Sequence, residues 1–103
     1  MDDRPVFNRI RQWGIDRGIV ANSTPTAQFL KTVEEVGELS QALAKGRTAD
    51  AVDAIGDIIV TLTLVSRCMG VDVEFCIEAA WDQIKDRRGY LTPEGVFVKE
   101  EAK

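Results

Sequence analysis

Between Val52 and Val65 the sequence is so rich in aliphatic residues that a helix through this segment is apolar on almost every side. A helix that is apolar all round is normally buried. The chain has only 103 residues, and a chain of this length buries about 60–65% of the surface of its unfolded form. Such a helix therefore needs a central position in a bundle or a second copy of the chain, and we expect a homodimer or homotetramer.

Capping and turn residues divide the chain into four expected helices. Thr24 and Pro25 are suited to a helix start, and glycines such as Gly46 and Gly70 are suited to helix ends. The predicted helices run over about 4–18, 25–45, 49–69 and 73–88. The short connections favour antiparallel neighbours. We predict an all-α, four-helix-bundle-like fold in a single domain over 1–103, with an irregular or extended C-terminal segment over about 89–103 lying on the helices.

Composition excludes several classes of chemistry. The sequence has no histidine and two cysteines, so neither a Ser-His-Asp triad nor a histidine-ligated zinc site can form. The two thiols, Cys68 and Cys76, fit a reducing compartment, and we expect a cytoplasmic protein. The formal net charge is −4, which disfavours non-specific binding to a nucleic-acid polymer. The longest apolar stretch, 58–65, is too short to cross a membrane, so no membrane partner is expected.

The remaining candidates for chemistry are carboxylates, and two predicted helices carry them in helical register. Glu35 and Glu38 share a stripe with Lys31 on the second helix, and Asp53 and Asp57 share a face of the third. If these helices pack antiparallel, the four carboxylates face one another. A hard divalent ion would relieve their repulsion, and Mg²⁺, or Mn²⁺ in its place, prefers such oxygen ligands.

Ordinary structural roles compete with this interpretation. Taken alone, Glu34 is best read as a solvated surface residue, and a salt bridge to Lys31 would equally explain Glu35 and Glu38. Asp53 suits either ligation or the favourable placement of an acid near a helix N-terminus. Asp57 is more informative, because it lies at the head of the apolar run, where an unpaired carboxylate is costly.

Two strings of residues carry a resemblance to a known family. Val33-Glu34-Glu35-Val36-Gly37-Glu38-Leu39, followed by Ala54-Ile55-Gly56-Asp57-Ile58-Ile59, is similar to the motifs of the MazG-like nucleoside triphosphate pyrophosphohydrolases, within the all-α NTP pyrophosphatase superfamily. The family pattern is EExxE and then ExxD on consecutive helices. The first half is matched in full. The second departs at Ala54, where the pattern has glutamate, and Asp53 is the neighbouring substitute.

The resemblance implies a specific reaction and a set of residue roles. Members of this family cleave a nucleoside triphosphate between the α and β phosphates and release the monophosphate and pyrophosphate. Carried over by position, Glu35, Glu38 and Asp57, with Asp53 as the substitute, would hold Mg²⁺. Glu34 or Glu38 would assist the attacking water.

Basic and aromatic residues complete the expected site. Lys31 lies on the stripe of Glu35 and Glu38, and Lys85 and Arg88 resemble the basic segment of the family near the triphosphate. For Lys85 and Arg88 a favourable interaction with the end of their own helix is an equal alternative. Trp13 is the candidate wall for the nucleobase.

The sequence therefore predicts a homo-oligomeric, Mg²⁺-dependent hydrolase that removes nucleoside triphosphates or deoxynucleoside triphosphates from the nucleotide pool. The alternative is a catalytically degenerate MazG-like bundle that binds nucleotide or a protein partner without hydrolysis. Ala54, in the place of an expected glutamate, motivates that alternative. A purely structural helical dimer is a third, plainer interpretation.

Overall fold

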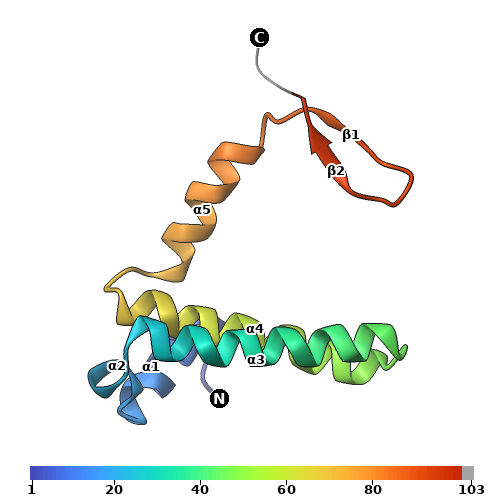
Figure 1. Ribbon diagram of the computed structural model, residues 1–103. Coiled ribbons are helices and arrows are strands. Elements are labelled where there is room, and N and C mark those ends of the chain that lie inside the picture. The colour runs from blue at the N-terminus through green and yellow to red at the C-terminus, as the bar shows by residue number, and fades with distance from the viewer. Residues whose placement is uncertain (101–103) are drawn as a thin grey trace. The chain divides into compact units, whose positions relative to one another are not determined.

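The computed structural model describes residues 1–100, and within them the secondary structure is almost entirely helical, with one small two-stranded sheet (Figure 1). The chain forms two compact units, Met1–Val73 and a second that begins at Glu74. The all-α class is confirmed for these residues. The grouping of the whole chain into a single domain stays a prediction.

Two long helices form the centre of the first unit. Helix α3 (Pro25–Ala44) and helix α4 (Thr48–Cys68) match the predicted second and third helices closely. The Thr24 side chain accepts a hydrogen bond from the Ala27 backbone N–H, as its predicted capping role requires. Gly46, at φ 66°, provides the tight turn between them, and the two helices run side by side as a hairpin (Figure 1).

Small and hydroxyl-bearing side chains fill the contact between α3 and α4. The Thr32 hydroxyl donates a 2.8 Å hydrogen bond to the Thr61 hydroxyl across the interface. Nearer the turn, Ala42, Ala51 and Ala54 are buried. Because these side chains are short, the two helices can approach each other closely while leaving room for hollows between them.

Many large apolar residues of the hairpin point elsewhere. Leu64 is buried, but nine others on α3 and α4 are each at least 37% exposed. These residues, which we call the open apolar sides, are Phe29, Leu30, Val33, Val36 and Leu43 on α3 and Val52, Ile55, Ile59 and Leu62 on α4. A single chain therefore leaves much of its apolar surface uncovered.

The first predicted helix, over 4–18, is wrong in its extent. Helix α1 (Val6–Asp16) ends earlier, and Gly18, at φ 75°, breaks the chain before a separate short helix, α2 (Ile19–Asn22). Gly14 is buried in α1, and a methyl group at this position would collide with the buried side chain of Leu64. The glycine thus allows α1 to lie directly against α4.

The second unit contains a helix and a β-hairpin. Helix α5 (Val73–Ile84) ends four residues before the predicted limit of 88. Strands β1 (Gly89–Leu91) and β2 (Phe97–Lys99) pair antiparallel, with Tyr90 opposite Val98. The segment predicted over about 89–103 as irregular or extended therefore forms two extended strands within 89–99, and its end, 101–103, lies outside the described residues. Its predicted position on the helices stays a prediction.

Within residues 1–100, no single helix is long and apolar enough to cross a membrane. Helices α4 and α5 reach the required length and hydropathy only when they are joined across the break between them.

Candidate functional site

A hollow of about 520 Å³ opens where α1, α2, α3 and α4 meet, and we call it the central hollow. Four of the predicted site residues line it: Trp13, Lys31, Glu35 and Asp57. They come from three helices, so the fold brings together residues that are up to 44 positions apart in the sequence. Val60 and Leu64 supply apolar wall beside these polar groups.

Glu35 is the buried carboxylate of the central hollow. Only 8% of the residue is exposed, because α3 turns this side toward α4. Its Oε2 atom is buried and has no hydrogen-bond partner. Its Oε1 atom lies 3.9 Å from Lys31 Nζ, and the same ammonium group lies 3.4 Å from Glu34 Oε2. Lys31 therefore compensates the charge of Glu35 only in part.

The pKa of Glu35 is raised above its ordinary value of 4.5. Burial is the main cause, since it disfavours the charged form. A side-chain hydrogen bond with Glu38, the negative charge of Glu38 and then that of Asp57 also raise the pKa of Glu35, and Lys31 opposes them. Three carboxylates that repel one another around a poorly compensated oxygen make an environment suited to a cation.

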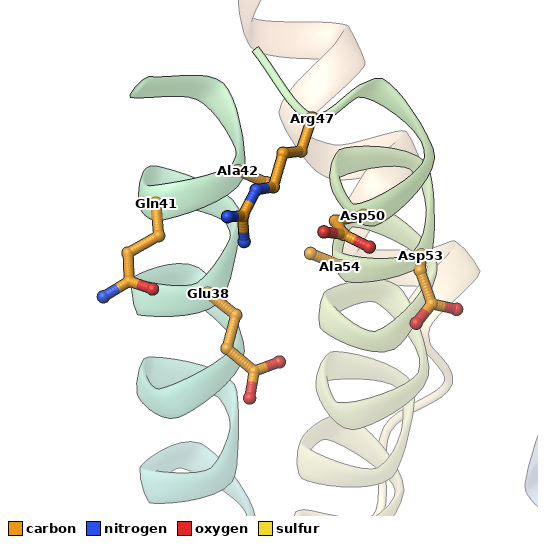
Figure 2. A pocket seen from close by; sticks show the side chains of 7 residues that line it. All are labelled: Glu38, Gln41, Ala42, Arg47, Asp50, Asp53 and Ala54. Atoms are coloured by element: carbon orange, nitrogen blue, oxygen red, sulfur yellow. The ribbon is translucent and has the colours of Figure 1, made fainter. Parts of the chain in front are cut away.

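A second hollow of about 240 Å³, the hairpin hollow, lies between α3 and α4 near their connecting turn. Glu38, Asp53 and Ala54 line it together with Arg47. Figure 2 shows Glu38 and Arg47 extending into the space between the helices, with the Asp53 carboxylate turned away from Glu38. The predicted carboxylates are thus distributed over two hollows along one hairpin, with Glu38 close to both groups.

Ala54 is only 4% exposed and lies on the side of α4 that contacts α3. In the resembling family this position carries a glutamate, which here would project toward Glu38 across the hairpin hollow. The structure therefore gives position 54 the orientation that a ligand would need, but alanine has no ligand atom. Asp53 borders the same hollow from the exposed side of the helix.

Arg47 is the site residue that the sequence analysis missed. It lies between Gly46, which the sequence marks only as a helix end, and the first residue of α4. Its guanidinium group extends into the space between α3 and α4, in a hollow that Glu38 and Asp50 also line (Figure 2). The sequence did offer a signal for Arg47: a basic residue in the turn between two helices that both carry acidic residues.

Glu34, Lys85 and Arg88 do not line either hollow as the structure describes them. The side chain of Glu34 is 58% exposed. Lys85 and Arg88 belong to the second unit and lie beyond the end of α5, so their predicted helical placement is wrong. Lys85 Nζ lies 3.5 Å from Asp82 Oδ1, and the phosphate-binding role of both residues stays a prediction.

The donor set of the central hollow fits a hard divalent ion. The unpartnered Oε2 of Glu35 is an available oxygen ligand, and Asp57 and Glu38 are close enough to influence its protonation. Within residues 1–100, no three acidic or thiol side chains already enclose a point where a metal ion would sit. Mg²⁺ is commonly bound through one or two carboxylates, with waters and substrate phosphates as its other ligands.

The chain is similar to a phage protein. It is 37% identical over 71 residues to the "Uncharacterized 18.2 kDa protein in rep-hol intergenic region" of Haemophilus phage HP1 (strain HP1c1). The matched region is 69% of this chain and 44% of that protein, so the chain spans less than half the length of its relative. No family profile matches the sequence, and no solved structure matches it. The printed name of the relative describes a genomic position and carries no activity to this chain.

The raised pKa of Glu35 predicts a pH-dependent stability difference. The folded protein binds the Glu35 proton more tightly than the unfolded chain, so the associated stability is complete below pH 4.5 and is lost as pH rises through the raised value. We expect Glu35→Gln, measured in EDTA, to melt at an increasingly higher temperature than wild type as pH is raised from 4.5 to about 7.

Glu34→Gln is the matched control, because it removes the same charge one position away from an exposed side chain. Its melting temperature relative to wild type should stay nearly constant over this range. If the melting temperatures of the two variants depended on pH in the same way, the raised pKa could not be assigned to Glu35.

Proposed function

We propose that the protein is an Mg²⁺-dependent nucleoside triphosphate pyrophosphohydrolase. The observation that carries this proposal is the buried, unpartnered Oε2 of Glu35, in a hollow that Asp57, Lys31 and Trp13 also line. Leaving a carboxylate oxygen buried without a partner is costly unless a ligand completes it. The EExxE resemblance then suggests which ligand and which reaction.

The residues of the hairpin would divide the work as follows. Glu35 and Asp57 would hold the ion, with Glu38 beside them. When bound, Mg²⁺ would neutralise phosphate charge and make an attacking water more acidic. Glu38, which lies close enough to Glu35 to raise its pKa, would accept the proton of that water. Water oxygen would bond to phosphorus as the bond between the α and β phosphates breaks, and pyrophosphate would leave.

Cationic and aromatic groups would bind the rest of the substrate. Lys31 borders the central hollow, where it would offset phosphate charge, and Arg47 lies farther along the same hairpin. Trp13 is 44% exposed, so one part of its ring is accessible to a nucleobase while the rest packs against the protein. Arg17 lies 5.7 Å from the centre of that ring and holds it from one side.

Position 54 favours a second candidate function, a bundle of the same kind that binds nucleotide or a protein partner without hydrolysis. Ala54 is buried against α3 and faces Glu38, so the site has one fewer carboxylate than the family pattern. With one carboxylate fewer, the site would hold the metal ion less firmly. Nucleotide could then still bind, although hydrolysis would be lost.

We also propose that the active form is a homodimer or homotetramer. The open apolar sides of α3 and α4 expose side chains that a soluble chain would normally cover, and α4 is the helix whose sequence is apolar all round. Two copies of one hairpin would bury these sides against each other as a four-helix bundle.

The activity prediction concerns pyrophosphate release from a panel of NTPs and dNTPs. Wild type should release pyrophosphate with Mg²⁺ and not with EDTA. Glu35→Gln and Asp57→Asn should each reduce the rate by about 100-fold or more, since changes that merely reorient metal ligands already cost roughly 10–100-fold. The control is Glu94→Gln, an exposed change in the turn between β1 and β2. It should leave the rate within about twofold of wild type, which corresponds to about 0.4 kcal/mol.

The same samples give a readout that does not need turnover. Mg²⁺ should raise the melting temperature of wild type but not of Glu35→Gln, because only a protein that binds the ion gains stability from it. Wild type that is folded, releases no pyrophosphate and shows no Mg²⁺-dependent melting shift would refute the metal site and the reaction together.

Ala54→Glu separates the hydrolase from the binding module. The new carboxylate would enter the hairpin hollow opposite Glu38, where the family pattern has its glutamate. If wild type is the hydrolase, Ala54→Glu should release pyrophosphate at a rate that differs only modestly from the wild-type rate. If wild type binds nucleotide with Mg²⁺ but releases no pyrophosphate, and Ala54→Glu does release it, the binding module is the correct function of the natural sequence.

The oligomer prediction concerns mass in solution. Wild type should elute in light-scattering chromatography at two or four times the mass of one chain. Ile55→Lys, on the open apolar side of α4, should dissociate it by placing a charge in the buried contact. Glu34→Lys, on the polar side of α3, should leave the mass unchanged, and a monomeric wild type would contradict the proposal.

A further inference from the structure

A further hollow, of about 440 Å³, lies between α1 and α4, and we call it the lateral hollow. We propose that it holds the base of the nucleotide and that Arg9 selects guanine there. This inference rests on the proposed function, which places the phosphates of the substrate in the central hollow. The lateral hollow is lined by Val6, Arg9, Ile10, Trp13, Asp57 and Val60.

The lateral hollow adjoins the central hollow. Trp13, Asp57 and Val60 line both of them. A nucleotide whose phosphates lie beside Lys31 and Glu35 therefore has a short path past Trp13 into the lateral hollow. Its base would then lie in the lateral hollow, and its sugar would lie at the boundary that Trp13 and Asp57 form.

The lateral hollow has the apolar surface that a flat aromatic base requires. Val6, Ile10 and Trp13 recur at intervals of four and three positions, so they occupy one side of α1. Val60 adds apolar surface from α4. Trp13 is 44% exposed, and Arg17, which lies over its ring, lines neither of the two hollows. The ring surface that borders the hollows is therefore available for stacking, and a purine covers more of it than a pyrimidine does.

Arg9 is the polar group that is placed to read the edge of the base. Its Nε atom donates a 3.1 Å hydrogen bond to the backbone carbonyl oxygen of Arg4. This bond restrains the guanidinium group, and the two terminal nitrogen atoms can still donate to a ligand. The Asp2 carboxylate is bound by the Arg4 guanidinium group through 2.7 Å and 3.0 Å hydrogen bonds. The lateral hollow thus combines an apolar wall with a restrained pair of donors, an arrangement typical of small-molecule sites.

The donors of Arg9 match guanine and oppose adenine. Guanine presents two neighbouring acceptors, O6 and N7, to which an arginine side chain donates two parallel hydrogen bonds. Adenine carries an amino group in place of O6, so it would set a donor against a donor. Pyrimidines have no N7 and stack over a smaller area. A well-formed pair of this kind discriminates against the wrong base by roughly 5- to 150-fold.

The test is quenching of Trp13 fluorescence by nucleoside monophosphates in EDTA. A Trp81→Phe background leaves Trp13 as the single tryptophan of the chain. GMP should bind at least about fivefold more tightly than AMP, CMP or UMP. Arg9→Gln should reverse the order of GMP and AMP, because a glutamine side chain both donates and accepts and so pairs with N6 and N7 of adenine. Partial unfolding would weaken the binding of both nucleotides and cannot reverse their order.

The control variant is Arg87→Gln, which removes the same charge from the second unit and should keep the wild-type affinities. Equal affinities of wild type for the four monophosphates, or an unchanged order in Arg9→Gln, would overturn the proposal. Quenching by none of them, as expected if a second copy of the chain covers the lateral hollow, would also overturn it.

This assay separates the base site from the reaction, because monophosphates in EDTA need neither Mg²⁺ nor turnover. Pyrophosphate release without a preference for guanine would leave the proposed function standing and overturn this inference. A preference for GMP that Arg9→Gln reverses, in a protein that releases no pyrophosphate, would refute the hydrolase and uphold the guanine site.

Discussion

The contact between α3 and α4 is made of short polar and alanine side chains, and the rest of the first unit depends on that choice. Most helix pairs bury their large aliphatic residues against each other. Here the Thr32–Thr61 hydrogen bond and the alanines near the turn occupy the contact. Because short side chains occupy this contact, Glu35 can be buried beside it, and nine large apolar residues are left exposed on the outer sides of both helices.

This arrangement carries an energetic cost within one helix pair. Glu35 is buried with one oxygen unpartnered, and its raised pKa records the cost of keeping the carboxylate charged there. Lys31 relieves that cost only in part, since its ammonium group is divided between Glu34 and Glu35. A single chain with so little apolar burial between its two main helices has little stability to spare. Association through the open apolar sides would supply what the polar contact does not.

Local chemistry made much of this architecture predictable. The Thr24 cap and the Gly46 turn are visible in the sequence. So is the helical spacing of Lys31 and Glu35 on one helix, with Asp57 on the next. The fold brings these three residues to one hollow with Trp13. The errors fall where tertiary structure decides. The break at Gly18 and the early end of α5 interrupt patterns that would allow a longer helix. The role of Arg47 emerges only when two helices are placed side by side.

Position 54 shows how one small residue can change the balance of charge in such a pair. A glutamate there would add a fourth carboxylate to the group formed by Glu35, Glu38 and Asp57, and each added negative charge would further oppose ionisation of the others. Alanine avoids that repulsion and leaves the hairpin hollow open, with Arg47 in its lining beside Glu38 and Asp50. The demand for a cation is then concentrated on the central hollow, where Glu35 has an oxygen without a partner. On the proposed function, Glu35 and Asp57 would hold the ion, and Glu38 would accept the proton of the attacking water.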